Sequence, residues 1–235
     1  MTHRFPYRMS YNKCNKYNYI RNFSDMNKEA LIVVDYQKDF CPGGALAVNG
    51  GDAISSAIAK EMYLTRMRSG LIVASFDWHP KDHSSFASSF GLPPFTMKDG
   101  EMKWPDHCVA GTEGAEMRFV PDLSDNRWEN MVPAPIDRKV YKGFEKDVDS
   151  YSAFGGFETP DRSSKSLEEI LRETGVRTVR IVGLALDYCV GSTALDSQKL
   201  GFETEILLSG TASVAPESEA AMIEKLKSAG VRLSA

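Results

Sequence analysis

The sequence predicts an α/β fold, in which a single doubly wound domain has a mainly parallel sheet of about six strands and helices on both of its faces. Short aliphatic runs at 30–34, 71–76 and 179–184 are typical of strands buried on both sides of a parallel sheet. The segments between them show the apolar spacing of helices, as at 51–68 and 166–173. Because strands alternate with helices, right-handed crossovers and one parallel sheet are expected.

Composition limits the classes of function. The chain has 235 residues, of which 42% are hydrophobic and 26% charged, as in an ordinary globular domain with a sizeable core. No apolar run approaches the ~18 residues of a membrane span. The net charge of -4 argues against a nucleic-acid-binding surface. We therefore expect a small-molecule substrate, no nucleic-acid partner and no membrane association. A homo-oligomer is compatible with the sequence, which does not set the oligomeric state.

The cysteines indicate a reducing compartment. There are 4 of them, they form no CxxC pair, and they are too sparse for a disulfide framework in a chain of this length. We therefore expect a cytoplasmic protein.

The N-terminus differs in charge from the body. Residues 1–24 contain no acidic residue, and the basic ones are Arg4, Arg8, Lys13, Lys16 and Arg21. We predict a basic, disordered extension over 1–27 and a folded domain over 28–235. An organellar transit peptide is the alternative, although the segment has few Ser or Ala residues.

Several polar residues follow the predicted strands. The strand 30–34 ends at Asp35, and ligands of open α/β sheets bind beyond the carboxyl ends of strands, so Asp35 and Phe40 would project toward a site. A short strand at 138–141 ends at Lys142, which alone is most often a solvated lysine. Beside a thiolate and a carboxylate, Lys142 would help to keep both ionised.

The histidines suggest a metal site. Asp77 and His79 are two residues apart, so on an extended backbone they point the same way. His83 follows four residues after His79, and His107 lies in a proline-rich stretch, 86–130, whose length is typical of a functional loop. Carboxylate and imidazole ligands suit zinc, iron or manganese. On spacing alone, polar loop residues are an equal alternative, because no motif such as HExxH is present. Neither GxGxxG nor a P-loop indicates a nucleotide cofactor.

Cys189 follows the buried strand 179–184 and a short loop. The next segment has helical character, so the cysteine is expected near a helix N-terminus, where the dipole and free N–H groups favour a thiolate and can hold an oxyanion. A small buried hydrophobe is the ordinary alternative for a lone cysteine.

Five stretches together carry a family resemblance. In order, they are VVDYQKDFCPGGALAV, DWHPKDHSSFAS, KWPDHCVAGTEGA, KGFEKDVDSYSAF and GLALDYCVGSTALD. This set resembles the nicotinamidases of the isochorismatase-like cysteine hydrolases, from about residue 30 to 233. The resemblance implies an isochorismatase-like fold and an amidohydrolase that acts on a linear amide C–N bond. By the same resemblance, we expect the enzyme to convert nicotinamide, and also pyrazinamide, to the acid and ammonia through a cysteine thioester, in NAD salvage.

The resemblance also implies residue roles. The catalytic residues are Asp35, Lys142 and Cys189, and the N–H groups of Ala185 and Cys189 form the oxyanion hole, with a cis Leu184–Ala185 peptide. The substrate-binding aromatic residues are Phe40, Trp104 and Tyr151. One divalent ion, zinc in the first place with iron or manganese as alternatives, is held by Asp77, His79 and His107. His83 stands where some relatives supply a further ligand and others do not.

Two other hypotheses are compatible with parts of the pattern. One is another hydrolase of the same scaffold, an isochorismatase or an N-carbamoyl amidase, and the set of metal ligands argues against it. The other is an inactive binding or regulatory protein, and the presence of all three catalytic residue types argues against that.

Overall fold

The structure is a computed structural model that describes residues 28–118 and 135–235. The strands are β1 (Glu29–Val34), β2 (Leu71–Asp77), β3 (Thr96–Lys98), β4 (Glu101–Lys103), β5 (Arg138–Lys142), β6 (Thr178–Leu184), β7 (Glu203–Ala212) and β8 (Arg232–Ser234). The helices are α1 (Ser55–Met67), α2 (Leu167–Glu173), α3 (Gly191–Lys199) and α4 (Pro216–Ser228). The predicted extension over 1–27 lies outside the described residues.

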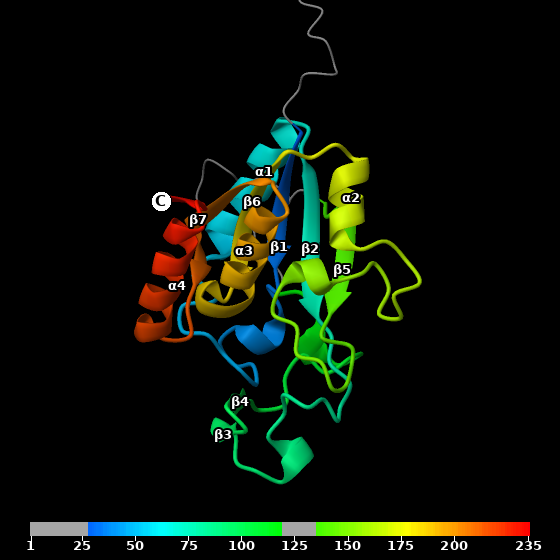
Figure 1. The fold of residues 1–235 in the computed structure, drawn as a ribbon, viewed down its shortest axis with the longest axis vertical. Coiled ribbons are helices and arrows are strands. Elements are labelled where there is room, and N and C mark those ends of the chain that lie inside the picture. The colour runs from blue at the N-terminus through cyan, green and yellow to red at the C-terminus, as the bar shows by residue number, and fades with distance from the viewer. Residues whose placement is uncertain (1–27, 119–134) are drawn as a thin grey trace, which may run out of the picture.

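Six of the strands form one parallel sheet in the order β5-β2-β1-β6-β7-β8 (Figure 1). Helix α1 lies behind this sheet in the view of Figure 1, and α2, α3 and α4 lie in front of it. Alternate residues of β1 enter two separate cores: Leu31 packs with Ile58 of α1, whereas Ile32 packs with Leu171 of α2. Both faces are therefore buried, which confirms the predicted α/β class and explains why the strands are continuously apolar.

Most predicted elements are present with shifted ends. Helix α2 begins after Ser166, whose hydroxyl accepts the N–H of Glu169 while the Glu169 carboxylate accepts the N–H of Ser166. Strand β7 is the longest strand of the described residues and runs as far as Ala212. The hairpin β3-β4 and strand β8 were not predicted, because three-residue strands are too short to show a periodic pattern. Among the described residues, no helix has the length and apolar character that a membrane span requires.

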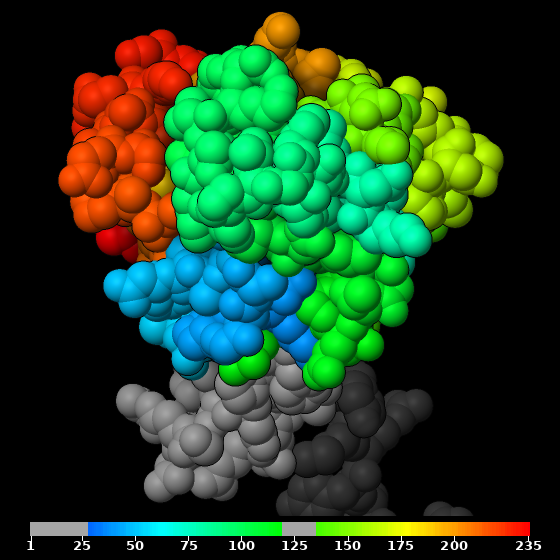
Figure 2. Space-filling view, turned by 90° about the horizontal axis from the view of Figure 1, so that it is seen from below, coloured from blue at the N-terminus to red at the C-terminus, as the bar shows by residue number. Residues whose placement is uncertain are grey.

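The chain reverses its direction across the sheet between β1 and β6. From β1 it passes to β2 and β5 on one side, and then returns to β6, β7 and β8 on the other. Gly183 allows the two strands to lie together here, because a Cβ atom at this residue would lie 2.0 Å from the carbonyl oxygen of Val34. Such switch points are where open α/β sheets bind ligands beyond the carboxyl ends of the strands. Figure 2 shows this end of the molecule, largely covered by the segment between β2 and β5 (green).

Candidate active site

Lys142 joins three elements at the carboxyl end of the sheet. Its ammonium nitrogen lies 2.9 Å from Oδ2 of Asp35 and 2.8 Å from Oδ1 of Asp77, and it donates to Sγ of Cys189 at 3.5 Å. Its side chain is fully buried. Burial alone would lower the pKa of Lys142, but the negative charges of Asp35 and Asp77 raise it well above the ordinary value, so the residue is an ammonium ion. Residues from β1, β2, β5 and the turn after β6 thus meet at one point.

Asp35 is held in one orientation directly after β1. Its backbone adopts the left-handed region with φ 44, which Asp tolerates better than most residues. The hydroxyl of Ser75 on β2 donates to its Oδ1 at 2.7 Å. Burial raises the pKa of Asp35 above its usual value, and the ammonium of Lys142 offsets only part of this effect. The carboxylate therefore takes up a proton more readily than an exposed aspartate does.

Cys189 lies in a five-residue π-helical segment, Leu186–Val190, that precedes α3. A regular helix start was predicted here, and the prediction that it favours a thiolate is wrong for the resting protein. Burial raises the pKa of the Cys189 thiol well above its usual value, Lys142 opposes this, and Asp35 adds to it. The reason is that the buried sulfur lacks the water that would solvate an anion. Cys189 therefore needs a base to become a nucleophile, and Asp35 is the neighbouring carboxylate.

Ala185 anchors the turn that carries the cysteine. Its carbonyl accepts the N–H groups of Tyr188 at 3.0 Å and Val190 at 3.1 Å. The Leu184–Ala185 peptide bond is cis, as the resemblance implies. Ala185 and Cys189 line the same pocket.

Asp77, His79 and His107 form a buried cluster whose ligand atoms all lie within 4.8 Å of one another. Nδ1 of His79 lies 2.7 Å from the carbonyl oxygen of Gly143, and Nδ1 of His107 lies 2.7 Å from that of Pro105. A carbonyl only accepts, so both Nδ1 atoms carry hydrogen. The Nε2 atoms, 3.1 and 3.8 Å from Oδ2 of Asp77, are then available as ligands. One carboxylate and two such imidazoles fit a divalent ion such as zinc.

Gly143 makes room for this cluster. A Cβ atom on it would lie 2.5 Å from Cε1 of His79 and 2.8 Å from Oδ1 of Asp77, and its φ of +66 also favours glycine. The backbone after β5 can therefore approach the ligands closely enough for the Gly143 carbonyl to orient His79.

His83 lies beside the cluster and is not part of it. Its ring is 4.2 Å from that of His79 between centroids. Its Nε2 lies 3.3 Å from the carbonyl oxygen of Val148, and its Nδ1 lies 2.7 Å from the hydroxyl of Ser85. Both ring nitrogens therefore have protein partners, and the three-residue cluster is the arrangement that suits a metal.

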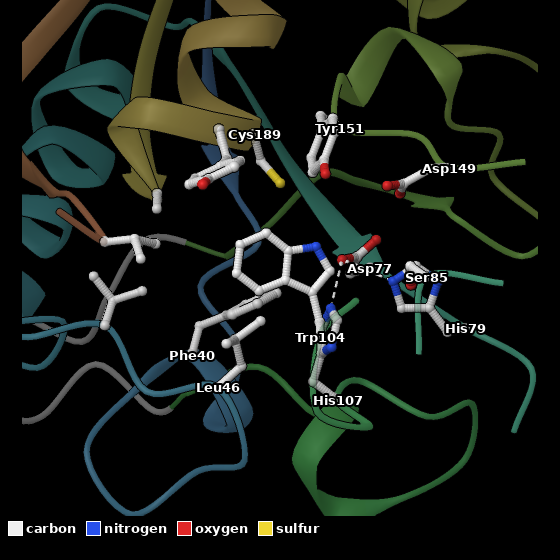
Figure 3. Close-up of a pocket in the computed structure, with 14 residues that line it drawn as sticks. Phe40, Leu46, Asp77, His79, Ser85, Trp104, His107, Asp149, Tyr151 and Cys189 are labelled. Carbon is white, nitrogen blue, oxygen red and sulfur yellow. Dashed lines mark ion pairs between the residues drawn. The ribbon is translucent and has the colours of Figure 1, made fainter. Parts of the chain in front are cut away.

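The sulfur of Cys189 and the cluster line one pocket (Figure 3). The predicted aromatic residues Phe40, Trp104 and Tyr151 line it. Trp104 packs edge-on against Tyr188, with ring centroids 5.4 Å apart. The lining residues that sequence reasoning missed are Leu46, Val48, Ser85, Asp149, Tyr188 and Val214.

Most of these residues carried a detectable signal. All of them except Val214 lie inside the motifs quoted above, and Tyr188 directly precedes Cys189. Asp35 and Lys142, in contrast, do not line the pocket, because both are fully buried beneath it.

Comparison with known proteins identifies the family. The isochorismatase domain profile matches residues 29–235. The chain belongs to the isochorismatase family. This isochorismatase-family chain is 37% identical over 214 residues to the nicotinamidase of Escherichia coli (strain K12), covering 88% of the chain and 95% of that relative.

Solved structures agree with the assignment to the isochorismatase family. The pyrazinamidase of Pyrococcus horikoshii in complex with zinc superposes with a TM-score of 0.68 at 36% identity, covering 88% of this chain and 98% of that one. PnC1 from L. infantum in complex with nicotinate gives a TM-score of 0.68 at 34% identity, with 88% and 92% coverage.

Proposed function

We propose that the chain is a metal-dependent nicotinamidase, which hydrolyses nicotinamide to nicotinate and ammonia in NAD salvage and also accepts pyrazinamide. The observation that carries the proposal is the contact of buried Asp35 and Lys142 with Cys189, which lines a pocket that also contains a buried cluster of metal-ligand type. The E. coli nicotinamidase, similar over most of its length, supports the same activity.

In the first half of the reaction, Asp35 takes the proton of the Cys189 thiol, and the sulfur attacks the carboxamide carbon. The oxyanion that forms accepts hydrogen bonds from the N–H groups of Ala185 and Cys189, at about 3 kcal/mol of transition-state stabilisation per donor in comparable sites. Asp35 then transfers its proton to the leaving nitrogen. Ammonia departs and a thioester remains on Cys189.

In the second half, Asp35 accepts a proton from water as the water attacks the thioester carbon, and it returns that proton to the sulfur as nicotinate leaves. A raised pKa suits both halves, because the same carboxyl group must gain and lose a proton in each. Lys142 keeps Asp35 ionised between these steps, despite the burial of both residues.

The aromatic residues and the ion would position the ring. Phe40, Trp104 and Tyr151 line the pocket and would pack against the pyridine ring. Asp77, His79 and His107 would hold the ion, for which we propose zinc, with iron or manganese as alternatives. When bound, the ion would supply a Lewis-acidic ligand position for the ring nitrogen and so orient the substrate.

The test is ammonia release from nicotinamide by the purified zinc-loaded protein, with Cys189→Ala as the control. The absence of release by the zinc-loaded protein would contradict the proposal. Hydrolysis of isochorismate or of an N-carbamoyl substrate instead would favour another branch of the family. The cytoplasmic location and the homo-oligomer stay predictions.

A further inference from the structure

Gln37, two residues beyond Asp35, is fully buried, and its side-chain amide is bonded at both ends. Its Nε2 donates to the carbonyl oxygen of Asp77 at 2.7 Å and to that of Ala115 at 2.9 Å. Its Oε1 accepts the N–H of Asp77 at 2.8 Å. The Gln37 side chain thus binds both backbone polar groups of a residue in the metal-ligand cluster.

These bonds replace a missing strand neighbour. The paired residues of β1 and β2 end at Val33 and Ala74, but β2 continues as far as Asp77. A buried N–H or carbonyl group without a partner is costly, so the end of β2 requires a substitute. The amide of Gln37 supplies one donor and one acceptor, as a strand backbone would, and so fixes the strand end from which the Asp77 side chain projects.

The side chain of Asp39 likewise binds backbone groups, here next to His107 in the metal-ligand cluster. Its Oδ2 accepts the N–H of Cys108 at 2.7 Å, and its Oδ1 accepts the N–H of Ala45 at 3.2 Å. Cys108 directly follows His107, and its carbonyl accepts the N–H of His79 at 3.0 Å. One short loop after β1 therefore holds the backbone at Asp77 and at the residue next to His107.

We propose that Gln37 and Asp39 are positioning residues for the divalent ion, which set the placement of Asp77 relative to His107. The inference rests on the proposed metal site. Both side chains bond to backbone groups, so changing them leaves the three donor side chains chemically intact and alters only their relative placement. Loss of such outer partners typically lowers metal affinity about 10–100-fold.

The experiment measures the zinc dissociation constant by competition with a chromophoric chelator, and the absorption spectrum of the cobalt-substituted protein. Gln37→Leu removes all three bonds at similar volume, Gln37→Glu places a carboxylate against two carbonyl oxygens, and Asp39→Ala removes both acceptors. We expect the zinc dissociation constant of each variant to rise at least about tenfold, with an altered cobalt spectrum. KM for nicotinamide should rise more than kcat falls, because the ion positions the substrate.

Thr204→Val is the matched control. Its hydroxyl donates to Ser197 at 2.8 Å in a buried position near the start of β7, at the opposite end of the sheet from the site. This variant should lose stability without any change in zinc affinity, which separates positioning of the ligands from general weakening of the fold.

Wild-type zinc affinity and cobalt spectrum in the folded Gln37 variants would overturn the inference. If neither Gln37 variant folds, the Asp39→Ala variant provides the test. A zinc dissociation constant of Asp39→Ala equal to that of the wild type would then overturn the inference. A wild-type protein that binds no zinc would overturn the metal site itself, and the inference with it. Tight binding by wild type and variants alike would overturn only the inference.

Discussion

Replacing Lys142 with Met tests the electrostatic design of the site, because methionine has a similar length and no charge. The ammonium group lies within 2.9 Å of Asp35 and 2.8 Å of Asp77, and it donates to the carbonyl of Ser150 at 3.0 Å. All of these contacts are removed from water. Removing one partner of a buried ion pair costs about 3–5 kcal/mol, and we expect this loss in the free energy of unfolding of Lys142→Met.

The same substitution should change the pH dependence of catalysis. Lys142 lowers the pKa of Asp35, so its loss raises that pKa. Asp35 must be ionised to accept the thiol proton, and therefore the acid limb of the kcat/KM profile should move to higher pH. A pKa shift of one unit corresponds to about 1.4 kcal/mol. If protonation of Asp35 recovers half of the about 3–5 kcal/mol that the substitution costs, the pKa of Asp35 and the acid limb of the kcat/KM profile move up by at least about one pH unit. The stability loss should shrink as pH falls, because protonated Asp35 no longer needs a cation.

Urea unfolding of the metal-free proteins and pH profiles of the zinc-loaded enzymes measure the two effects. Lys146→Met makes the same change in a solvent-exposed pair with Asp82, 2.7 Å away, and should alter neither. A Lys142→Met protein with wild-type stability and an unmoved acid limb would refute the reasoning.

Three further predictions concern other parts of the site. Cys189→Ala should abolish ammonia release and keep the wild-type circular dichroism spectrum, and appreciable turnover would exclude cysteine catalysis. Burial lowers the pKa of His107 to about 4, so below pH 6.5 the unfolded chain binds more protons, and the metal-free protein should lose about 3 kcal/mol of stability between pH 6.5 and 4. In urea unfolding, the stability of His107→Gln should fall less between pH 6.5 and 4. The same pH dependence of stability in the variant and the wild type would contradict this prediction. The Asp187 carboxylate accepts the N–H groups of Val214 and Ala215 at the start of α4, and Val214 lines the pocket. Asp187→Ala should therefore lower the free energy of unfolding by about 1–3 kcal/mol and raise KM. Urea unfolding and KM values equal to those of the wild type would count against this role.

The sequence predicted the parts of the fold that depend on local pattern. The apolar runs of β1, β2 and β6 are buried on both faces, and the sheet is parallel, as predicted. The π-helical segment Leu186–Val190 could not be foreseen, because its apolar spacing resembles that of an ordinary helix start.

Burial of polar residues is the part that local pattern cannot supply. A lysine at a strand end is usually solvated, and Lys142 is buried only because Asp35 and Asp77 arrive from two other strands. Gln37 has an ordinary sequence context, and its function depends on Asp77, forty residues away. Such roles depend on tertiary contacts and become visible only in the folded chain.

The placement of Asp35 and Lys142 below the pocket floor has a consequence for inhibitor design. A molecule that enters the pocket meets the sulfur, the aromatic walls and the histidine cluster over most of its surface, whereas Asp35 and Lys142 are fully buried and are not among the lining residues. In the proposed mechanism, Asp35 acts on the ligand only where it exchanges protons beside the sulfur. We therefore expect a tight competitive ligand to draw its affinity from sulfur-reactive or metal-coordinating groups on a flat ring. Charges added to pair with Asp35 or Lys142 would carry a desolvation penalty.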